Sequence, residues 1–170
     1  MKAITVLFFS ILILATNAFN QELNKTIFSE RANSLILIGH CDRDAFALPE
    51  FQTWFDENYE IYVPDDKVVK ALLLINTKNI SITIVMATWC SDSRREVPRL
   101  YRIFDEIGFP ENQVSIINVN TEKLLPEEDI SKLQIERVPT IIVYKDKKET
   151  GRIVEIPGKS LEEDLFELLK

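Results

Sequence analysis

Cys90 and the three residues that follow it are the part of the chain best suited to chemistry. Cys90 comes directly after an apolar run at residues 80–88, which reads as a strand, and just before a helical pattern. A cysteine at such a junction lies beside free backbone N–H groups and the positive end of the helix dipole, both of which stabilise a thiolate. A dithiol redox site would carry a second cysteine three residues later, where this chain has Ser93. We therefore expect a nucleophilic thiol without a second sulfur in its own motif.

The residues next to Cys90 act on its thiolate in opposite directions. Ser93 could donate a hydrogen bond to the sulfur, and Arg94, four residues further on, would add a favourable positive charge. Asp92 has the opposite effect, because a nearby negative charge disfavours a second one. The sequence leaves the balance of these effects open.

A thiol without a resolving partner stops at a mixed disulfide, and three routes lead on from there. An external small-molecule thiol could release the product. Cys41, the only other cysteine, could act as a distal resolving thiol if the two Cα atoms lie about 4.4–6.8 Å apart. Alternatively, Cys90 does not turn over, and the surrounding groove only binds peptides or thiols.

Cys41 also permits a purely structural reading. In an oxidising compartment, two cysteines can form one stabilising disulfide. A Cys41–Cys90 bridge would close a loop of roughly 50 residues and contribute about 4 kcal/mol in the chain-entropy model. The neighbouring His40 is the only histidine, and the chain has no C-x-x-C motif, so we predict no metal site. With only four glycines and no phosphate-binding loop, we predict no cofactor.

The N-terminus indicates export. Lys2 is followed by an apolar run at residues 3–15, and Thr16-Asn17-Ala18 supplies the small residues of a cleavage site. We predict a signal peptide at residues 1–18 and an exported, periplasmic or secreted, mature protein. An uncleaved anchor is the alternative, but the run is shorter than the roughly 20 residues that span a bilayer. After cleavage, we expect no membrane span.

Composition limits the class of protein. The 170 residues suffice for one domain with a single core. The formal net charge of −7 at pH 7 argues against a nucleic-acid partner, since binding to phosphates needs a basic face. The partners that remain are protein or small-molecule thiols and disulfides.

The hydrophobic pattern predicts an α/β fold. We expect a loose leader at 19–34, and after the strand at 80–88 a helix at 91–107 that Gly108 ends. The other expected elements are a strand at 34–39, a helix carrying the aromatic residues of 51–62, a helix starting at Pro64-Asp65-Asp66, a strand at 113–119, a short helix within 124–133, a hairpin from 140–144 and 151–156, and a last helix opened by the capping box Ser160–Glu163. This order implies a mixed central sheet with helices on both faces.

Three motifs, at defined positions along the chain, resemble those of the thioredoxin fold. Trp89-Cys90 follows a buried strand, Pro98 lies eight residues after Cys90, and Val138-Pro139-Thr140 stands just before the hairpin. The resemblance implies a three-layer fold with a mixed central sheet flanked by helices. It also implies that Pro139 forms a cis peptide bond beside the reactive cysteine.

A closer resemblance is to exported bacterial thioredoxin-like proteins that carry a Cys-x-x-Ser motif. The motifs are Trp89-Cys90-Ser91-Asp92-Ser93, 95–99 (Arg-Glu-Val-Pro-Arg) and 137–140 (Arg-Val-Pro-Thr). The resemblance implies a reacting centre of Cys90, Ser93 and Pro139. The residues expected to line it are Trp89, Ser91, Asp92, Arg94, Val138 and Thr140. It further divides the chain into the signal peptide at 1–18, a leader and N-terminal extension at 19–63, and the thioredoxin-like domain at 64–170.

The departures from the thioredoxin pattern shape the expected function. Ser93 replaces the resolving cysteine, Asp92 replaces a proline, and Ile84 replaces a buried aspartate that assists proton transfer. We therefore expect monothiol-type thiol-disulfide exchange through Cys90 in the bacterial envelope, in the context of cell redox homeostasis. The alternative is a non-catalytic binding or chaperone-like module that uses the groove beside Pro139.

Overall fold

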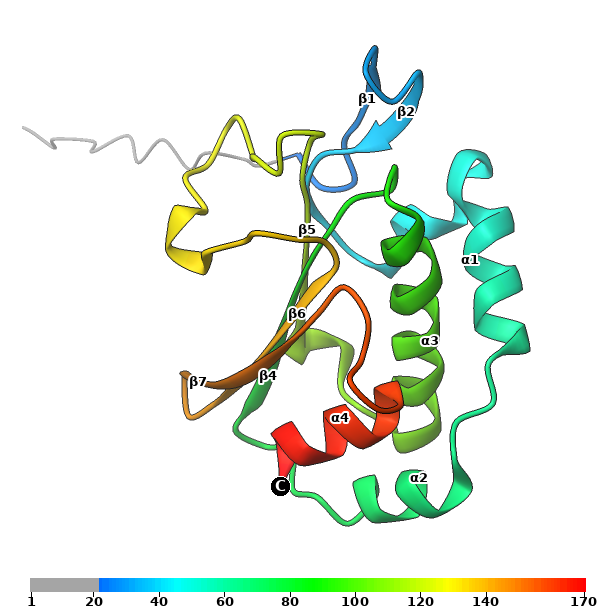
Figure 1. Ribbon diagram of the computed structural model, residues 1–170, viewed down its shortest axis with the longest axis vertical. Coiled ribbons are helices and arrows are strands. Elements are labelled where there is room, and N and C mark those ends of the chain that lie inside the picture. Colours follow the sequence, from blue (N-terminus) through cyan, green and yellow to red (C-terminus); the bar gives the residue numbers. More distant parts are fainter. Residues whose placement is uncertain (1–21) are drawn as a thin grey trace, which may run out of the picture.

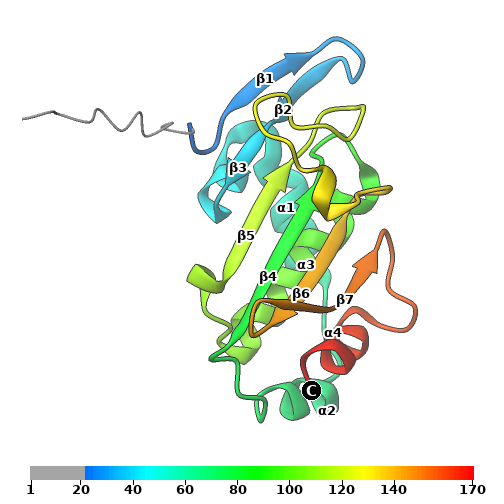
Figure 2. The same cartoon turned by 90° about the vertical axis from the view of Figure 1, so that its left-hand side faces the viewer.

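A five-stranded mixed sheet forms the centre of the computed structural model, which describes residues 22–170 (Figure 1). Figure 2 shows the sheet face-on. Its strands lie side by side in the order β3 (Gly39–Cys41), β5 (Val114–Asn118), β4 (Ile80–Met86), β6 (Thr140–Lys145) and β7 (Lys148–Val154). Strands β4 and β5 run parallel, and the other neighbours pair antiparallel.

The α-helices all lie against one face of this sheet (Figure 1). They are α1 (Pro49–Ile61), α2 (Asp66–Leu72), α3 (Ser91–Ile107) and α4 (Leu161–Leu169). Alternate residues of the central strand, Ile82, Ile84 and Met86, point into the same buried cluster as the apolar faces of these helices. Ile84, which stands where thioredoxins have an aspartate, is thus fully buried core.

The opposite face of the sheet carries a thinner third layer. The segment 119–139 packs over Val85, Ala87 and Ile117, and its helical part is the short 3-10 helix η3 (Ser131–Leu133). The α/β class and the mixed sheet agree with the sequence, but the expected helices on this face are reduced to that single turn. One reason is local: Asn120 accepts hydrogen bonds from the backbone N–H groups of Glu122 and Leu124, which favours a turn over a helix.

Helix α3 begins and ends where its sequence predicts. Cys90 is the N-cap residue, and Gly108 ends the helix in the left-handed conformation, with φ of 63°. Pro98 lies inside the helix and is buried with Val97 and Leu100. The left-handed backbone at the C-cap explains the glycine, since other residues rarely adopt it.

The N-terminal part is more ordered than predicted. Strands β1 (Thr26–Ser29) and β2 (Ser34–Leu37) form a separate antiparallel hairpin, so the expected loose leader is wrong from Thr26 onward. The strand expected at 34–39 is divided between β2 and β3. Exposed and half-buried residues alternate along the short strand β1. Ile27 and Ile36 are cross-strand partners, and both pack on the body of the protein, as one face of a strand pair would.

The rest of the extension is fastened to α3. The 3-10 helix η1 (Arg43–Ala47) follows β3, and Arg43 forms a two-pronged ion pair with Asp105 at 2.8 and 2.7 Å. Tyr59 on α1 donates a hydrogen bond to the same carboxylate at 2.6 Å. The predicted aromatic stripe packs as expected, with Phe51 and Phe55 buried.

The C-terminal elements follow the sequence closely. A short 3-10 helix, η2 (Glu111–Gln113), leads into β5, and the hairpin of β6 and β7 turns at residues 146–147. The capping box at the start of α4 is present, with Ser160 and Glu163 bonded in both directions. The predicted signal peptide at 1–18 lies outside the described residues. Within 22–170, no helix is long and apolar enough to cross a membrane.

Candidate functional site

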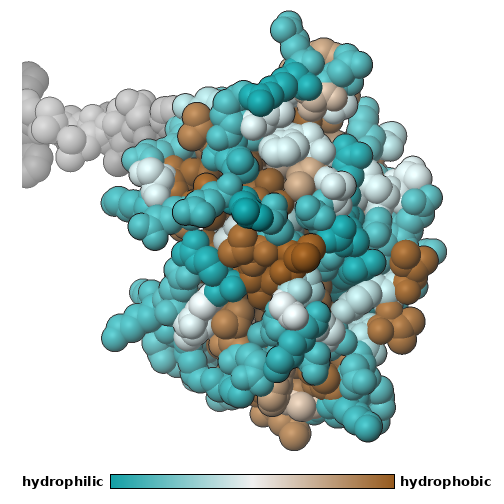
Figure 3. All heavy atoms as spheres, viewed as in Figure 1, coloured by the Kyte–Doolittle hydropathy of each residue, from teal (hydrophilic) through white to brown (hydrophobic). Residues whose placement is uncertain are grey.

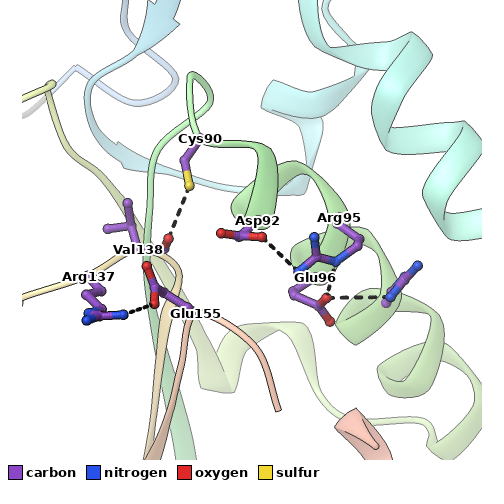
Figure 4. A network of polar contacts seen from close by, with 8 residues as sticks. Cys90, Asp92, Arg95, Glu96, Arg137, Val138 and Glu155 are labelled. Carbon is purple, nitrogen blue, oxygen red and sulfur yellow. Dashed lines mark hydrogen bonds and ion pairs between the residues drawn. The ribbon is translucent and has the colours of Figure 1, made fainter.

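The thiol of Cys90 lies at the junction of β4 and α3, half-exposed at the start of the helix. Its Sγ atom donates a hydrogen bond to the carbonyl oxygen of Val138 at 3.2 Å (Figure 4). The Val138–Pro139 peptide bond is cis, which confirms the conformation expected of this proline. Two segments that are 48 residues apart in the sequence therefore meet at the sulfur.

The loop around Pro139 is held in place by three further contacts. Thr140 donates from its hydroxyl to the carbonyl of Arg137 at 2.6 Å, and Glu155 donates from its backbone N–H to the carbonyl of Pro139 at 2.8 Å. Arg137 and Glu155 also form an ion pair at 2.5 Å (Figure 4). The end of β7 is therefore one wall of the site.

Apolar side chains flank this wall. Val154 and Ile156, on either side of Glu155, are 40% and 58% exposed. Figure 3 shows apolar surface near the middle of this face of the molecule, surrounded by hydrophilic side chains. The site therefore offers an apolar surface next to the thiol.

Ser93 has a different partner from the one expected. Its hydroxyl oxygen is buried and accepts a hydrogen bond from the backbone N–H of Ala87 at 3.3 Å. This bond joins the end of β4 to the first turn of α3, while the Cys90 sulfur bonds to Val138 instead. The side chain thereby fixes the strand-to-helix junction that presents Cys90.

The other expected site residues surround the junction. The ring N–H of Trp89 donates to the carbonyl of Val119 at 3.2 Å, and Ser91 is exposed on the first turn of α3. Arg94 donates from Nε to the carbonyl of Thr88 at 2.5 Å, and its guanidinium lies 5.9 Å from the ring centre of Trp54. This side chain is therefore directed toward the extension as well as the site.

A chain of charged residues leads from the site into the protein. Asp92 pairs with Arg95 at 2.8 Å, and Arg95 also contacts Glu96 at 2.5 Å (Figure 4). Glu96 is only 3% exposed. Sequence reasoning missed this network, although the spacing of three residues between Asp92 and Arg95 on one helix was the available signal.

Cys41 and Cys90 lie in different parts of the protein. Both cysteines are free, so the structure does not contain the disulfide that was one of the alternatives for this pair. Cys41 belongs to the buried cluster on the helical face of the sheet, whereas Cys90 packs against the cluster on the opposite face. The amide of Asn118 donates to the Cys41 sulfur at 2.9 Å, and burial raises the pKa of this thiol to about 12. The structure thus does not bring Cys41 to Cys90 as a resolving thiol.

His40, next to Cys41, faces a carboxylate. Its Nε2 atom lies 2.9 Å from Oε2 of Glu128. This contact ties β3 to the segment that covers the open face of the sheet.

The arrangement of these elements decides the fold class. A strand–helix–strand unit, β4–α3–β5, is followed by the β6–β7 hairpin and α4. A cis-proline directly before β6 lies beside the cysteine at the start of α3. The fold is thioredoxin-like. Within it, the cysteine motif reads Cys-x-x-Ser, because Ser93 occupies the fourth position.

Comparisons with known proteins find solved structures of low sequence identity and no family model that matches the chain. A protein of unknown function from Pseudomonas aeruginosa aligns with a TM-score of 0.52 at 18% identity, covering 74% of this chain and 77% of its own. An HIV epitope scaffold aligns with a TM-score of 0.52 at 18% identity, covering 78% and 83%. A mutant thioredoxin from Halobacterium salinarum aligns with a TM-score of 0.36 at 15% identity, covering 54% and 72%.

Proposed function

We propose that this protein carries out monothiol-type thiol-disulfide exchange through Cys90. The observation that carries the proposal is the position of the Cys90 sulfur, which is half-exposed at the start of α3 and 3.2 Å from the carbonyl of Val138 beside cis-Pro139. A thiol at a helix start is favoured as a thiolate, and partial exposure lets a disulfide approach it.

The exchange has two steps. The Cys90 thiolate attacks one sulfur of a disulfide, forms a mixed disulfide, and releases the other sulfur as a thiolate that takes a proton from water. A small-molecule thiolate then attacks the mixed disulfide, regenerates the Cys90 thiolate, and leaves as a new disulfide with the first substrate half. No second sulfur of the protein is needed.

Cys41 has no part in this scheme. Its sulfur is buried among apolar side chains on the opposite face of the sheet, and its raised pKa, about 12, keeps it protonated at neutral pH. The thiolate, not the thiol, is the nucleophile in exchange. Resolution therefore falls to a thiol from outside the chain.

The proposed substrates are protein or small-molecule disulfides in an exported compartment. The apolar side chains of Val154 and Ile156, next to the Pro139 loop, would pack against the substrate. Export rests on the signal-peptide pattern at 1–18. N-terminal sequencing of protein from the producing cell tests it: we expect a mature chain that begins at Phe19, and a retained Met1 would contradict export by cleavage.

The function is tested by turnover of an uncharged small disulfide with an excess of external thiol. The unmodified protein should accelerate the exchange, and Cys90→Ser should abolish the acceleration. Cys41→Ser is the matched control and should keep it, because the buried thiol takes no part. Turnover that survives Cys90→Ser would overturn the proposal. Partner capture that also survives it would favour the binding or chaperone-like alternative.

A further inference from the structure

Arg94 is an arginine without an acidic partner in the part of the chain that the structure describes. In residues 22–170, every other arginine contacts an aspartate or a glutamate. The chain has 27 acidic residues against 20 basic ones, so an unpaired guanidinium next to the site is unexpected. Its Nε donates to Thr88, which leaves the four N–H groups on its two terminal nitrogens available.

Arg94 lines a small pocket beside the reactive cysteine. The pocket has a volume of about 290 Å³. It is lined by Arg31, Ala32, Ser34, Trp89, Arg94 and Thr121. Trp89 directly precedes Cys90 in the chain, and the first three residues come from the β1–β2 hairpin region. The pocket therefore combines two guanidinium groups, two hydroxyl groups and the flat aromatic side chain of the residue that precedes Cys90.

Both walls of the pocket are anchored on Thr88, two residues before Cys90. The backbone N–H of Leu37, at the end of β2, donates to the Thr88 hydroxyl at 3.1 Å, and Arg94 donates to the Thr88 carbonyl at 2.5 Å. The place of the pocket relative to Cys90 is thus fixed by the fold.

The second cation of the pocket is held only loosely. Arg31 pairs with Glu122 at 2.9 Å, but the two side chains are 71% and 50% exposed. Exposed ion pairs of this kind contribute little to stability. An incoming anion would therefore have only a weak ion pair to displace from Arg31.

We propose that this pocket binds a carboxylate of the disulfide that reacts at Cys90, so that the preferred substrates are acidic thiols and disulfides. The inference rests on the proposed function. A guanidinium matches the geometry of a carboxylate with two parallel hydrogen bonds, and the hydroxyl of Ser34 can donate a further one. The hydroxyl of Thr121 already donates to Glu122 at 3.1 Å. Such a carboxylate is offered by a small acidic thiol or by an acidic side chain of a peptide.

The test compares disulfides that differ only in charge. Glutathione disulfide serves as the ionised probe and its carboxyl methyl esters as the neutral one, and mass spectrometry follows formation of the Cys90 mixed disulfide. Loss of a charge-assisted contact predicts that the ionised probe reacts about tenfold faster than its ester. Arg94→Gln should remove that ratio, and Arg94→Lys should keep part of it.

Arg102→Gln is the matched control. Arg102 lies on the same helix, pairs with Glu106 at 2.9 Å, and is not among the residues that line the pocket. It should leave the ratio unchanged. If Arg94→Gln slows the ionised and the esterified probes equally, the side chain acts only on the fold and the proposal is overturned. The same ratio of ionised to esterified rates can be measured for a disulfide of an acidic peptide. A ratio larger than that of glutathione disulfide would indicate that the carboxylate belongs to a peptide substrate, and a smaller ratio would indicate a small acidic thiol.

A separate measurement tests ligand binding in this pocket without relying on exchange activity. S-Methylglutathione cannot exchange, so its binding reports the pocket alone, and quenching of Trp89 fluorescence in a Trp54→Phe background follows it. Binding that Arg94→Gln weakens about tenfold supports the pocket even if no disulfide reacts at Cys90, in which case the proposed function fails by itself. Equal binding by the two proteins overturns the pocket.

Discussion

The Sγ atom of Cys90 donates a hydrogen bond to the carbonyl oxygen of Val138 at 3.2 Å. The contact joins the start of α3 to the loop that carries cis-Pro139. If a disulfide reacts at Cys90 as proposed, the thiol would have to leave the Val138 carbonyl, which could then accept an N–H group of the substrate.

Arg95 should govern the reactivity of Cys90 through Asp92. The ion pair of Arg95 with Asp92 at 2.8 Å offsets a negative charge two residues from the thiol. Arg95→Gln leaves that charge unopposed, and we expect alkylation of Cys90 by iodoacetamide at pH 7 to slow about threefold, as expected for one unscreened nearby charge.

The double variant Asp92→Asn/Arg95→Gln is the control for this effect. It removes both charges and should restore the rate of alkylation. Persistent slowing in the double variant would show that Arg95 acts on the fold of the first turn and not on the charge of Asp92.

Cys41 should make stability depend on alkaline pH. Burial raises its pKa from 9.0 to about 12 in the folded protein. Below pH 9 the thiol is protonated in both states, so its contribution to stability is fully present. Between pH 9 and about 12 only the unfolded chain loses the proton, which lowers the free energy of unfolding as pH rises.

Chemical unfolding at pH 8 and at pH 10.5 measures this contribution. Cys41→Ala removes the group, so the fall in stability between the two pH values should be smaller in the variant than in the unmodified protein. The same fall in both proteins would show that the thiol is not shielded as the structure indicates.

Tyr62 should contribute to stability by joining the extension to α4. Its hydroxyl donates to Glu162 at 2.5 Å, and the same carboxylate accepts the backbone N–H of Asp65 at 2.9 Å. Tyr62→Phe removes a bond to a buried charged group, and we expect the free energy of unfolding to fall by about 1–2 kcal/mol. Tyr144→Phe is the control, because the Tyr144 hydroxyl has no hydrogen-bond partner within 22–170. Equal losses in urea unfolding would contradict the assigned role.

The sequence carries much of the fold because local signals agree with the tertiary structure. Gly108 ends α3, Ser160 opens α4, and the apolar run at 80–88 becomes β4, each through chemistry contained within a few residues. The hairpin of β1 and β2 was not predicted because its strands are only four residues long. The alternation signal is weak at that length.

The hydrogen-bond partners of side chains within the site could be predicted less well from the sequence. Ser93 was expected to face the Cys90 sulfur but accepts a bond from Ala87, because the tight junction of strand and helix turns its hydroxyl inward. Cys41 and Cys90 lie on opposite faces of the sheet, which depends on strand register and not on spacing along the chain. Cys41 is paired with Ile116 of β5, while Cys90 lies outside the strands as the N-cap residue of α3.

The position of the mixed disulfide on the protein directly tests whether Cys90 is the reacting thiol. The folded protein is incubated with bis(2-hydroxyethyl) disulfide at pH 7, and the adduct is located by peptide mapping without reduction. We expect one adduct, on Cys90, that external thiol removes, with Cys41 unmodified. An adduct on Cys41, or an unmodified Cys90 in protein that is fully folded, would contradict it.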